Sequence, residues 1–464
     1  MRSLVVLFVL AAMFAGVSVF AQSGVVSNVK VTMQAVGTFD TVSPSGMIEM
    51  KCCADEAEPA SFVVKVSRDV SGAIVKLTGD LVSSNKNKIP ATAAELRIVE
   101  GERLIAFKEV DLKAGKDMRF WLTLRVPQRT PAGTYTGDVA VFVSGRPIAK
   151  LPMKVTILPM RLLLPSKQYG YSLRSGGVSE ETYKALLARL PSYGIVLTSI
   201  SGPIESIPQG IKNVRDAKLG TTIVYYNPGL TYDEILKAYR TAASAGVTRL
   251  FYVNDYESSD EAVLEKTYEM MRFMKLRLEH TMAVINNQTA YEKLGSVAEC
   301  TALHISLPYV QELLAGKQRV QGRKDWWYWD IAAASAKENR LNAGLMLWKS
   351  GLDGVFIPHL PTDSTDEVGE PIFDSVLGEA FREGTDDVRY LTTMMNALRE
   401  VKDGIKAGKF KNPVPAQMLV DETEKYLATC MAKPLMSLKN SDYQDMRMRF
   451  ADYAMKLRAI APKY

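Results

Sequence analysis

The pattern of hydrophobic and polar positions changes near residue 160 and divides the chain into two parts. From about residue 25 to 158, short β-branched and aromatic runs alternate with turn clusters, as at residues 61–66, 120–126 and 138–143. Side chains alternate between the two faces of a strand, so this pattern predicts an all-β sandwich. After Pro165, short apolar strands alternate with helical segments, which is typical of βα units.

The second part contains eight strand-like segments, as many as a (β/α)8 TIM-like barrel needs. They lie near residues 169–174, 195–199, 221–226, 249–254, 283–286, 302–306, 325–329 and 354–357. Thr231-x-x-Glu234 and Ser258-x-x-Glu261 predict capped helix starts, and Gly246 suits a helix end. An open doubly wound sheet is the competing fold, but the sequence lacks the glycine-rich phosphate loops that usually accompany it.

The N-terminus has the pattern of a secretory signal. Arg2 precedes an apolar run up to Ala21, and Val19 and Ala21 are the small residues that a cleavage site requires. We therefore expect an exported protein, periplasmic or extracellular, with no membrane span after cleavage. The predicted organisation is a signal peptide at 1–21, a sandwich at 22–160, a barrel at 161–395 and a helical region at 396–464.

Composition narrows the function classes. A chain of 464 residues is too long to fold around a single hydrophobic core. The net charge of +6 comes from interleaved basic and acidic residues without a basic stripe, which argues against nucleic-acid binding. The four cysteines match no metal-site spacing, so we interpret them as buried or incidental thiols, and the sequence leaves their disulfide state open. Three histidines in all offer little material for a metal site or a catalytic triad. We predict no metal and no cofactor, and the sequence does not determine the oligomeric state.

Residues 326–329 form an unusual aromatic run, Trp-Trp-Tyr-Trp, with Asp325 and Asp330 on its two sides. The run lies on the seventh predicted strand, and the carboxyl ends of barrel strands face the active site. Rings exposed there could stack on a sugar, with carboxylates binding its hydroxyls. The alternative is that alternate members only pack. We expect at least one exposed ring at the mouth, and packing for Trp327.

Two carboxylates follow the fourth predicted strand. Asp255 and Glu257 stand two residues apart, so an extended backbone directs both to the same side. Glycoside hydrolysis needs one protonated and one ionised carboxyl group. The alternative is that they cap the next helix, as acidic residues after strands often do. Both interpretations stay open from the spacing alone.

Several segments together resemble glycoside hydrolase family 123 and its relatives of unknown function, over nearly all of the chain up to about residue 395. They are VPQRTPAGTYTGDVAV (126–141), WWYW with RLNAGLMLWKSGLDGV (340–355), and EAFREGTDDVRYL (379–391), which is the most specific. The resemblance implies a sandwich joined to a (β/α)8 barrel. It also implies cleavage of a β-linked N-acetylhexosamine, in which the substrate's own acetamido oxygen attacks the anomeric carbon.

The resemblance implies roles for the two carboxylates: Asp255 orients the acetamido group and Glu257 is the general acid. The family places these residues adjacently, whereas Tyr256 separates them here. The chain also has Pro358-His359-Leu360 where relatives carry an aromatic residue. A non-catalytic glycan-binding protein and a structural or envelope-interaction protein are therefore the alternatives. We expect a carbohydrate partner, contacted by Trp326, Tyr328, Trp329, Tyr226, Tyr171, Arg174 and Asp325.

Overall fold

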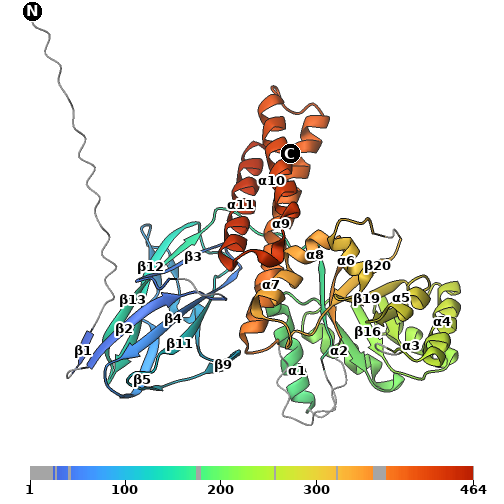
Figure 1. Cartoon of the computed structure of the whole chain (residues 1–464), viewed down its shortest axis with the longest axis horizontal. Coiled ribbons are helices and arrows are strands. Elements are labelled where there is room, and N and C mark those ends of the chain that lie inside the picture. Colours follow the sequence, from blue (N-terminus) through green and yellow to red (C-terminus); the bar gives the residue numbers. More distant parts are fainter. Residues whose placement is uncertain are drawn as a thin grey trace, which may run out of the picture.

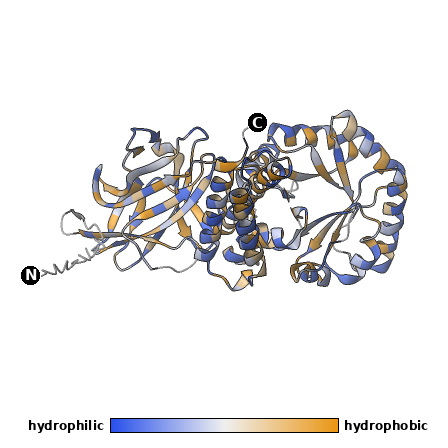
Figure 2. Ribbon diagram, turned by 90° about the horizontal axis from the view of Figure 1, so that it is seen from above, coloured by the Kyte–Doolittle hydropathy of each residue, from blue (hydrophilic) through white to orange (hydrophobic). Residues whose placement is uncertain are grey.

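The molecule consists of a β-sandwich, a parallel β/α barrel and a group of long C-terminal helices (Figure 1). The computed structural model describes residues 24–26, 29–39, 43–173, 179–254, 258–319, 322–358 and 372–462. Viewed from above, the sandwich lies at one end, the barrel forms a ring at the other, and the C-terminal helices stand between them (Figure 2). The predicted fold class is confirmed.

The sandwich packs a six-stranded sheet against a seven-stranded sheet. The first contains, in order, β1 (Gly24–Val26), β2 (Val29–Val36), β4 (Ala57–Val66), β11 (Met118–Arg125), β8 (Ala94–Glu100) and β9 (Arg103–Ala106). The second contains β10 (Val110–Leu112), β5 (Val70–Leu77), β12 (Gly133–Val143), β13 (Arg146–Ile157) and β3 (Ile48–Cys52), with β6 (Leu81–Ser83) and β7 (Lys88–Ile89) beside β12. Their inner faces share one hydrophobic core that is separate from the core of the barrel.

Strand β11 is buried on both faces. Phe120, Leu122 and Leu124 point into the core between the sheets. Trp121 and Thr123 alternate with them and face the opposite way, where Trp121 packs beside Val376 and its indole N–H donates to Thr123 Oγ1 at 3.2 Å. Trp121 is thus fully buried, but it packs where the sandwich meets the rest of the molecule.

The barrel has all eight predicted strands, each within a few residues of its expected place. They are β14 (Gln168–Tyr171), β15 (Leu197–Ser201), β16 (Thr222–Tyr226), β17 (Arg249–Val253), β18 (Met282–Ile285), β19 (Cys300–His304), β20 (Lys324–Tyr328) and β21 (Gly354–Ile357). All pair in parallel, and β14 pairs with β21. A bridge between Tyr252 and Thr281 joins β17 to the β18 side, so the sheet is nearly closed.

The helices around the barrel begin at defined caps. They are α1 (Glu180–Arg189), α2 (Ile207–Asp216), α3 (Tyr232–Ser244), α4 (Glu261–Leu276), α5 (Gln288–Leu294), α6 (Pro308–Leu314), α7 (Ala336–Ala343) and α8 (Leu345–Ser350). The capping box at Thr231 and Glu234 is confirmed, and Gly246 follows the end of α3 at φ 78°. The prediction for Ser258 is wrong, because Asp260 caps α4 by accepting from the Val263 N–H.

Helix α9 (Val376–Lys406) runs for 31 residues from the barrel into the C-terminal helices α10 (Val414–Ala432) and α11 (Asn440–Ile460). The expected boundary at 395/396 therefore falls inside one continuous helix and is not a structural break. The sandwich ends at Ile157 and the barrel begins at Gln168, so the expected boundary at 160/161 falls in the linker.

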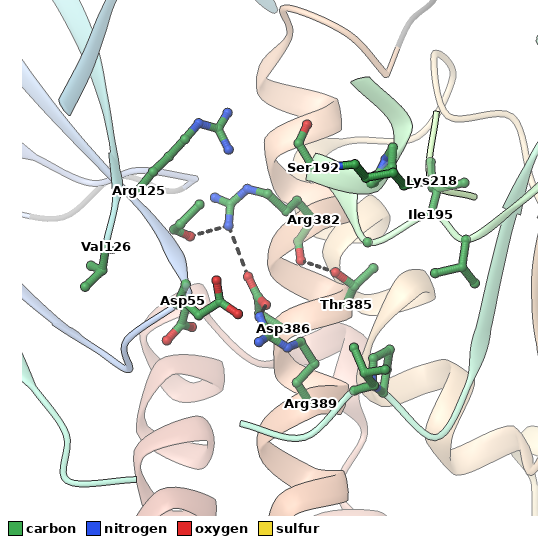
Figure 3. A pocket seen from close by; sticks show the side chains of 17 residues that line it. Asp55, Arg125, Val126, Ser192, Ile195, Lys218, Arg382, Thr385, Asp386 and Arg389 are labelled. Atoms are coloured by element: carbon green, nitrogen blue, oxygen red, sulfur yellow. Dashed lines mark hydrogen bonds and ion pairs between the residues drawn. The ribbon is translucent and has the colours of Figure 1, made fainter. Parts of the chain in front are cut away.

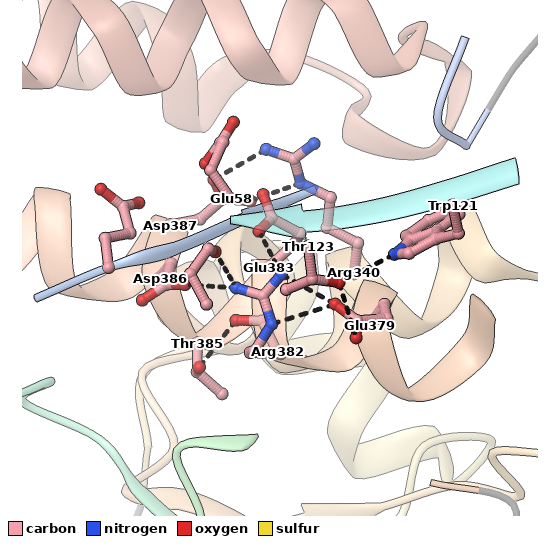
Figure 4. Close-up of polar contacts among 12 residues, drawn as sticks. Glu58, Trp121, Thr123, Arg340, Glu379, Arg382, Glu383, Thr385, Asp386 and Asp387 are labelled. Carbon is pink, nitrogen blue, oxygen red and sulfur yellow. Dashed lines mark hydrogen bonds and ion pairs between the residues drawn. The ribbon is translucent and has the colours of Figure 1, made fainter. Parts of the chain in front are cut away.

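The sandwich, α9, α7 and α11 meet in a buried ionic cluster (Figure 4). Its members are Glu56, Glu58, Arg97, Arg340, Glu379, Arg382, Glu383, Asp386, Asp387, Arg389 and Arg447. Arg97 Nη2 of the sandwich reaches Glu379 Oε1 at 2.6 Å, and Arg447 Nε of α11 reaches Asp387 Oδ1 at 2.6 Å. The EAFREGTDDVRYL segment thus forms the junction between the parts of the molecule.

All four cysteines are buried free thiols. No helix in the described part of the chain is long and apolar enough to cross a membrane. The signal segment at 1–21 lies outside the described residues and stays a prediction.

Candidate active site

The pleat of the barrel strands determines which residues of the aromatic run point inward. Trp326 on β20 packs edge-on against Phe251 of β17, at 5.7 Å between ring centroids, and stacks on Phe356 of β21 at 6.0 Å. Strands β17 and β20 are far apart around the wall, so these rings meet across the barrel interior. Trp326 and Tyr328 therefore point inward, and Trp327 and Trp329 point outward.

The outward residues of the run serve packing. Trp329 stacks on Phe381 of α9 at 5.9 Å, and its indole N–H donates to Asn339 Oδ1 at 2.8 Å. Trp327 packs edge-on against Trp329. Packing had been expected for Trp327, but Trp329 had been predicted to contact sugar. Its contacts with α7 and α9 put it on the outer face of the barrel, away from the mouth.

Asp325 also lies away from the mouth, although it had been predicted to bind sugar. It is the second residue of β20, at the amino end of the strand, and it is 0% exposed. Its carboxylate accepts from Thr301 Oγ1 at 2.6 Å and from Arg323 Nε at 2.5 Å. Asp325 therefore binds neighbouring side chains on the outer face of the barrel.

None of the four rings is exposed, which corrects the expectation of an open aromatic platform. The exposed fractions are 1% for Trp326, 0% for Trp327, 1% for Tyr328 and 3% for Trp329. Trp326 and Tyr328 line the interior at two levels, with Tyr328 at the carboxyl end of its strand. Sequence alternation identified the two faces correctly, but barrel closure decided how much of each ring is covered.

Hydroxyl groups gather at the carboxyl ends of the first three barrel strands. Ser172 Oγ and Ser199 Oγ lie 2.5 Å apart, and both residues are buried. Ser201 pairs with Tyr226 on the next strand, and the same alternation directs both inward. Tyr226 is half-buried, so the predicted contact residue Tyr226 does lie at the mouth.

His304 completes the mouth on the sixth strand beside Tyr328. The two rings meet edge-on at 5.2 Å. The imidazole Nδ1 contacts Ser306 Oγ at 2.6 Å and accepts from the Ser306 backbone N–H at 3.4 Å. An accepting Nδ1 places the proton of the neutral ring on Nε2. The sequence pattern does not single out His304 or the mouth serines, although they lie at the ends of predicted strands.

A chain of hydrogen bonds fixes the backbone around the third and fourth strand ends. Tyr225 OH donates to the Gly202 carbonyl at 2.8 Å, and Asn227 Nδ2 donates to Tyr225 OH at 2.9 Å. Tyr252 OH donates to the Asn227 carbonyl at 2.8 Å and contacts Asn254 Oδ1 at 3.3 Å. Burial raises the pKa of Tyr252 above its ordinary value, so the phenol remains a donor.

The side chain of Asn254 is held at both ends of its amide. Its Nδ2 donates to Thr267 Oγ1 of α4 at 3.1 Å, and its Oδ1 accepts from the Gly229 N–H at 3.3 Å. Asn254 directly precedes Asp255 in the sequence. The segment leading to the two predicted carboxylates is thus fixed in the described structure.

The remaining predicted site residues divide into two groups. Asp255, Glu257, Arg174 and His359 lie outside the described residues. Tyr171 follows Gly170 on β14. A Cβ at Gly170 would lie against the side chains of Leu197 and Phe356, which point into the barrel, so Gly170 faces inward. Tyr171 therefore points to the outer face, so its predicted sugar contact does not fit its orientation. Among the described residues, no cluster of His, Cys, Asp or Glu could hold a metal ion.

A cavity of about 480 Å³ lies between the sandwich, the barrel and α9 (Figure 3). Its walls include Asp55, Arg125, Ser192, Ile195, Lys218 and Arg382. Ser192 and Ile195 precede β15, and Lys218 precedes β16, so the cavity faces the amino ends of the strands. Barrel enzymes act at the opposite end. The cavity is thus an interdomain space, and the mouth remains the candidate active site.

Fold and site together define a two-domain protein, a sandwich joined to a parallel barrel whose mouth carries hydroxyl, amide and imidazole groups. The structure is similar to that of a family 123 glycoside hydrolase from Clostridium perfringens, with a TM-score of 0.62 and 8% identity, over 92% of this chain and 97% of that chain. The chain is therefore family 123-like in fold.

Two further solved structures have lower similarity. A family 39 glycoside hydrolase from Bacteroides cellulosilyticus WH2 gives a TM-score of 0.34 at 10% identity, over 74% of this chain and 82% of that chain. A dihydrodipicolinate synthase from Agrobacterium tumefaciens str. C58 gives 0.31 at 12%, over 63% and 98%. No protein-family model and no curated protein matches the sequence.

Proposed function

We propose that this protein is a glycosidase that cleaves a β-linked N-acetylhexosamine with retention of configuration. The observation that carries the proposal is the similarity to a family 123 glycoside hydrolase over 92% of this chain, which includes both the sandwich and the barrel. The mouth supports it, because serine and tyrosine hydroxyls and an imidazole are groups that hydrogen-bond sugar hydroxyls.

In this proposal Asp255 orients the acetamido group of the substrate and Glu257 is the general acid. Strand β17 supports these positions, because it ends at Val253 and is the fourth barrel strand, after which the family carries its carboxylate pair. Tyr256 separates the two carboxylates. A bulge or tight turn at Tyr256 would bring them to the geometry of adjacent residues, and such irregularities are common beside active sites.

The sugar ring would be bound by the inward groups at the mouth. Tyr226, Tyr328 and His304 lie at the carboxyl ends of the third, seventh and sixth strands. Arg174, which follows the first strand in the sequence, stays a candidate contact. Trp326 lies one level deeper than Tyr328, where its ring forms part of the floor under the site.

The test is hydrolysis of aryl β-glycosides with and without a 2-acetamido group. We expect the wild-type protein to cleave the acetamido substrates. General acid catalysis typically contributes about 10²–10⁴-fold, so Glu257→Gln should slow poor leaving groups by that order and good leaving groups less. Asp255→Asn should slow both alike. Glu261→Gln is the matched control, because Glu261 is a nearby exposed residue in the first turn of α4.

The leaving-group dependence separates the assignments. Full activity of Glu257→Gln on poor leaving groups would show that another residue donates the proton. A second candidate function is glycan binding without catalysis. It is favoured by the separation of Asp255 and Glu257 by one residue, because the family carries these two carboxylates next to each other. Binding of N-acetylhexosamine oligosaccharides without cleavage of any substrate would support it. If the protein neither binds nor cleaves these saccharides, the structural or envelope-interaction role is the remaining alternative.

We also propose that the protein is exported to the periplasm or beyond the cell. The sequence of residues 1–21 supports this, with Arg2 before an apolar run that ends at Val19-Phe20-Ala21. Sequencing the N-terminus of exported material should give Gln22 as the first residue. Material that begins at Met1 would contradict the proposal.

A further inference from the structure

Three arginines converge on a groove where the sandwich, the interdomain linker and α11 meet. The groove has a volume of about 720 Å³. Arg129 comes from the loop between β11 and β12, Arg161 from the linker after β13, and Arg458 from the last turn of α11. The other lining residues are Ala54, Gln128, Thr130, Ala132, Leu158, Pro159 and Met160. We call this feature the arginine groove.

The arginine groove contains positive charge without a matching negative charge. None of its lining residues is acidic. Within the described part of the chain, none of the three guanidinium groups lies within ion-pair distance of a carboxylate. Arg458 Nη1 donates to the backbone carbonyl of Arg161 at 3.3 Å, so the Arg458 guanidinium lies beside the linker that carries Arg161. Like charges held together attract an anion.

The backbone that presents the arginines is held in place. The Thr130 N–H donates to the Pro127 carbonyl at 3.0 Å, which closes the turn that carries Arg129. The Leu158 N–H donates to the Cys52 carbonyl at 2.8 Å, and the Met160 N–H to the Leu158 carbonyl at 2.9 Å. The attraction between a cation and the carboxyl end of a helix accounts for the position of Arg458 in the last turn of α11. It explains neither Arg129 nor Arg161, which come from other segments.

We propose that the arginine groove binds an anionic saccharide through its sulfate or carboxylate groups. Guanidinium groups bind such oxyanions in planar, bidentate geometry. Gln128 and Thr130 add neutral groups suited to sugar hydroxyls, and Pro159 adds an apolar surface suited to a ring face. The choice of a saccharide as carrier rests on the proposed glycosidase function, whereas the preference for an anion rests on the groove alone.

The test measures binding by titration calorimetry with the full mature chain. The probes are a sulfated heparin tetrasaccharide, a hyaluronan tetrasaccharide, neutral chitotetraose and inorganic sulfate. We expect the two anionic saccharides to bind more tightly than inorganic sulfate, and their affinity to fall with added salt. Arg129→Gln, Arg161→Gln and Arg458→Gln should each lower that affinity about tenfold, since each removes a hydrogen bond to a charged group.

Matched controls separate the groove from general charge. Arg68→Gln and Arg146→Gln each remove one exposed arginine elsewhere on the sandwich and should leave binding unchanged. Equal losses in the control variants would overturn the proposal, as would undiminished binding in all three groove variants. So would binding of inorganic sulfate as tight as that of the saccharides, or no binding of any anion.

The outcome is distinguishable from that of the proposed glycosidase. The groove variants should hydrolyse neutral aryl glycosides at the wild-type rate, because the groove and the barrel mouth share no lining residue. Loss of anion binding with intact hydrolysis supports the groove as a separate site. A protein that binds the anionic tetrasaccharides at the groove and cleaves no substrate supports the groove while contradicting the glycosidase.

Discussion

The buried ionic cluster predicts an unusual effect of pH on stability, which Glu56→Gln should reveal. The cluster holds six carboxylates (Glu56, Glu58, Glu379, Glu383, Asp386, Asp387) and five arginines (Arg97, Arg340, Arg382, Arg389, Arg447). One negative charge is thus unmatched. Burial, with Asp386 nearby, raises the pKa of Glu56 from 4.5 to about 7. Burial, with Glu383 nearby, raises the pKa of Glu58 as well.

The direction of the effect follows from proton linkage. The folded protein holds a proton on Glu56 up to about pH 7, whereas the unfolded chain releases it near pH 4.5. Stability therefore falls as the pH rises through this window. Raising the pKa of this carboxyl group from 4.5 to about 7 corresponds to about 3 kcal/mol of unfolding free energy. Because the carboxylates interact, the titration belongs to the cluster as a whole.

Other members of the cluster act in the opposite direction. Burial alone would raise the pKa of Glu379, but Arg382 and Arg97 lower it, and Arg340 and Arg447 do the same for Asp387. Those two groups add stability above their ordinary pKa values and lose it in acid. The informative quantity is therefore the difference in unfolding free energy between Glu56→Gln and wild type at each pH.

The assay is urea unfolding at several pH values, followed by circular dichroism and tryptophan fluorescence. Glutamine keeps an oxygen for the bonds that Glu56 accepts from the Cys53 N–H at 2.7 Å and Tyr390 OH at 2.8 Å. We expect the variant to gain about 3 kcal/mol of unfolding free energy over wild type as the pH rises from about 4.5 to about 7. Glu109→Gln, an exposed glutamate of the sandwich, is the control. Parallel curves for Glu56→Gln and wild type would refute the reasoning.

Two further predictions concern packing and the mouth. Gly384→Ala should lower the unfolding free energy by about 1–3 kcal/mol, because the new Cβ would lie 2.3 Å from a backbone carbonyl oxygen of α7. Gly79→Ala is the control and should change the stability little, because the space around Gly79 is open. Equal effects of the two substitutions in thermal unfolding would contradict this prediction. Tyr252→Phe should lower kcat on acetamido substrates by more than its loss of about 1 kcal/mol in stability explains, because Asn254 loses its hydrogen-bond partner at Tyr252 OH. Tyr232→Phe, at an exposed tyrosine, is the control. An unchanged kcat in Tyr252→Phe would sink the idea.

The sequence by itself determined the elements of this protein and their order. Local periodicity is a property of neighbouring residues, so the change of pattern near Pro165 separated sandwich from barrel, and all eight barrel strands were found. The capping box at Thr231 was found for the same reason, since its hydrogen bonds join residues three apart. Alternation along residues 326–329 also fixed that two rings point one way and two the other.

Only the tertiary structure decided what those residues contact. Trp121 lies in a predicted sandwich strand, yet it packs beside Val376 of α9. The two residues are 255 positions apart in the sequence, and no pattern of neighbouring residues encodes such a contact. The EAFREGTDDVRYL segment was recognisable as a motif, but its role required the arginines that the sandwich, α7 and α11 bring to it. Asp325 was placed at the mouth because the run beside it is aromatic. Its burial against Arg323 depends on strand direction and barrel closure, which long-range packing sets.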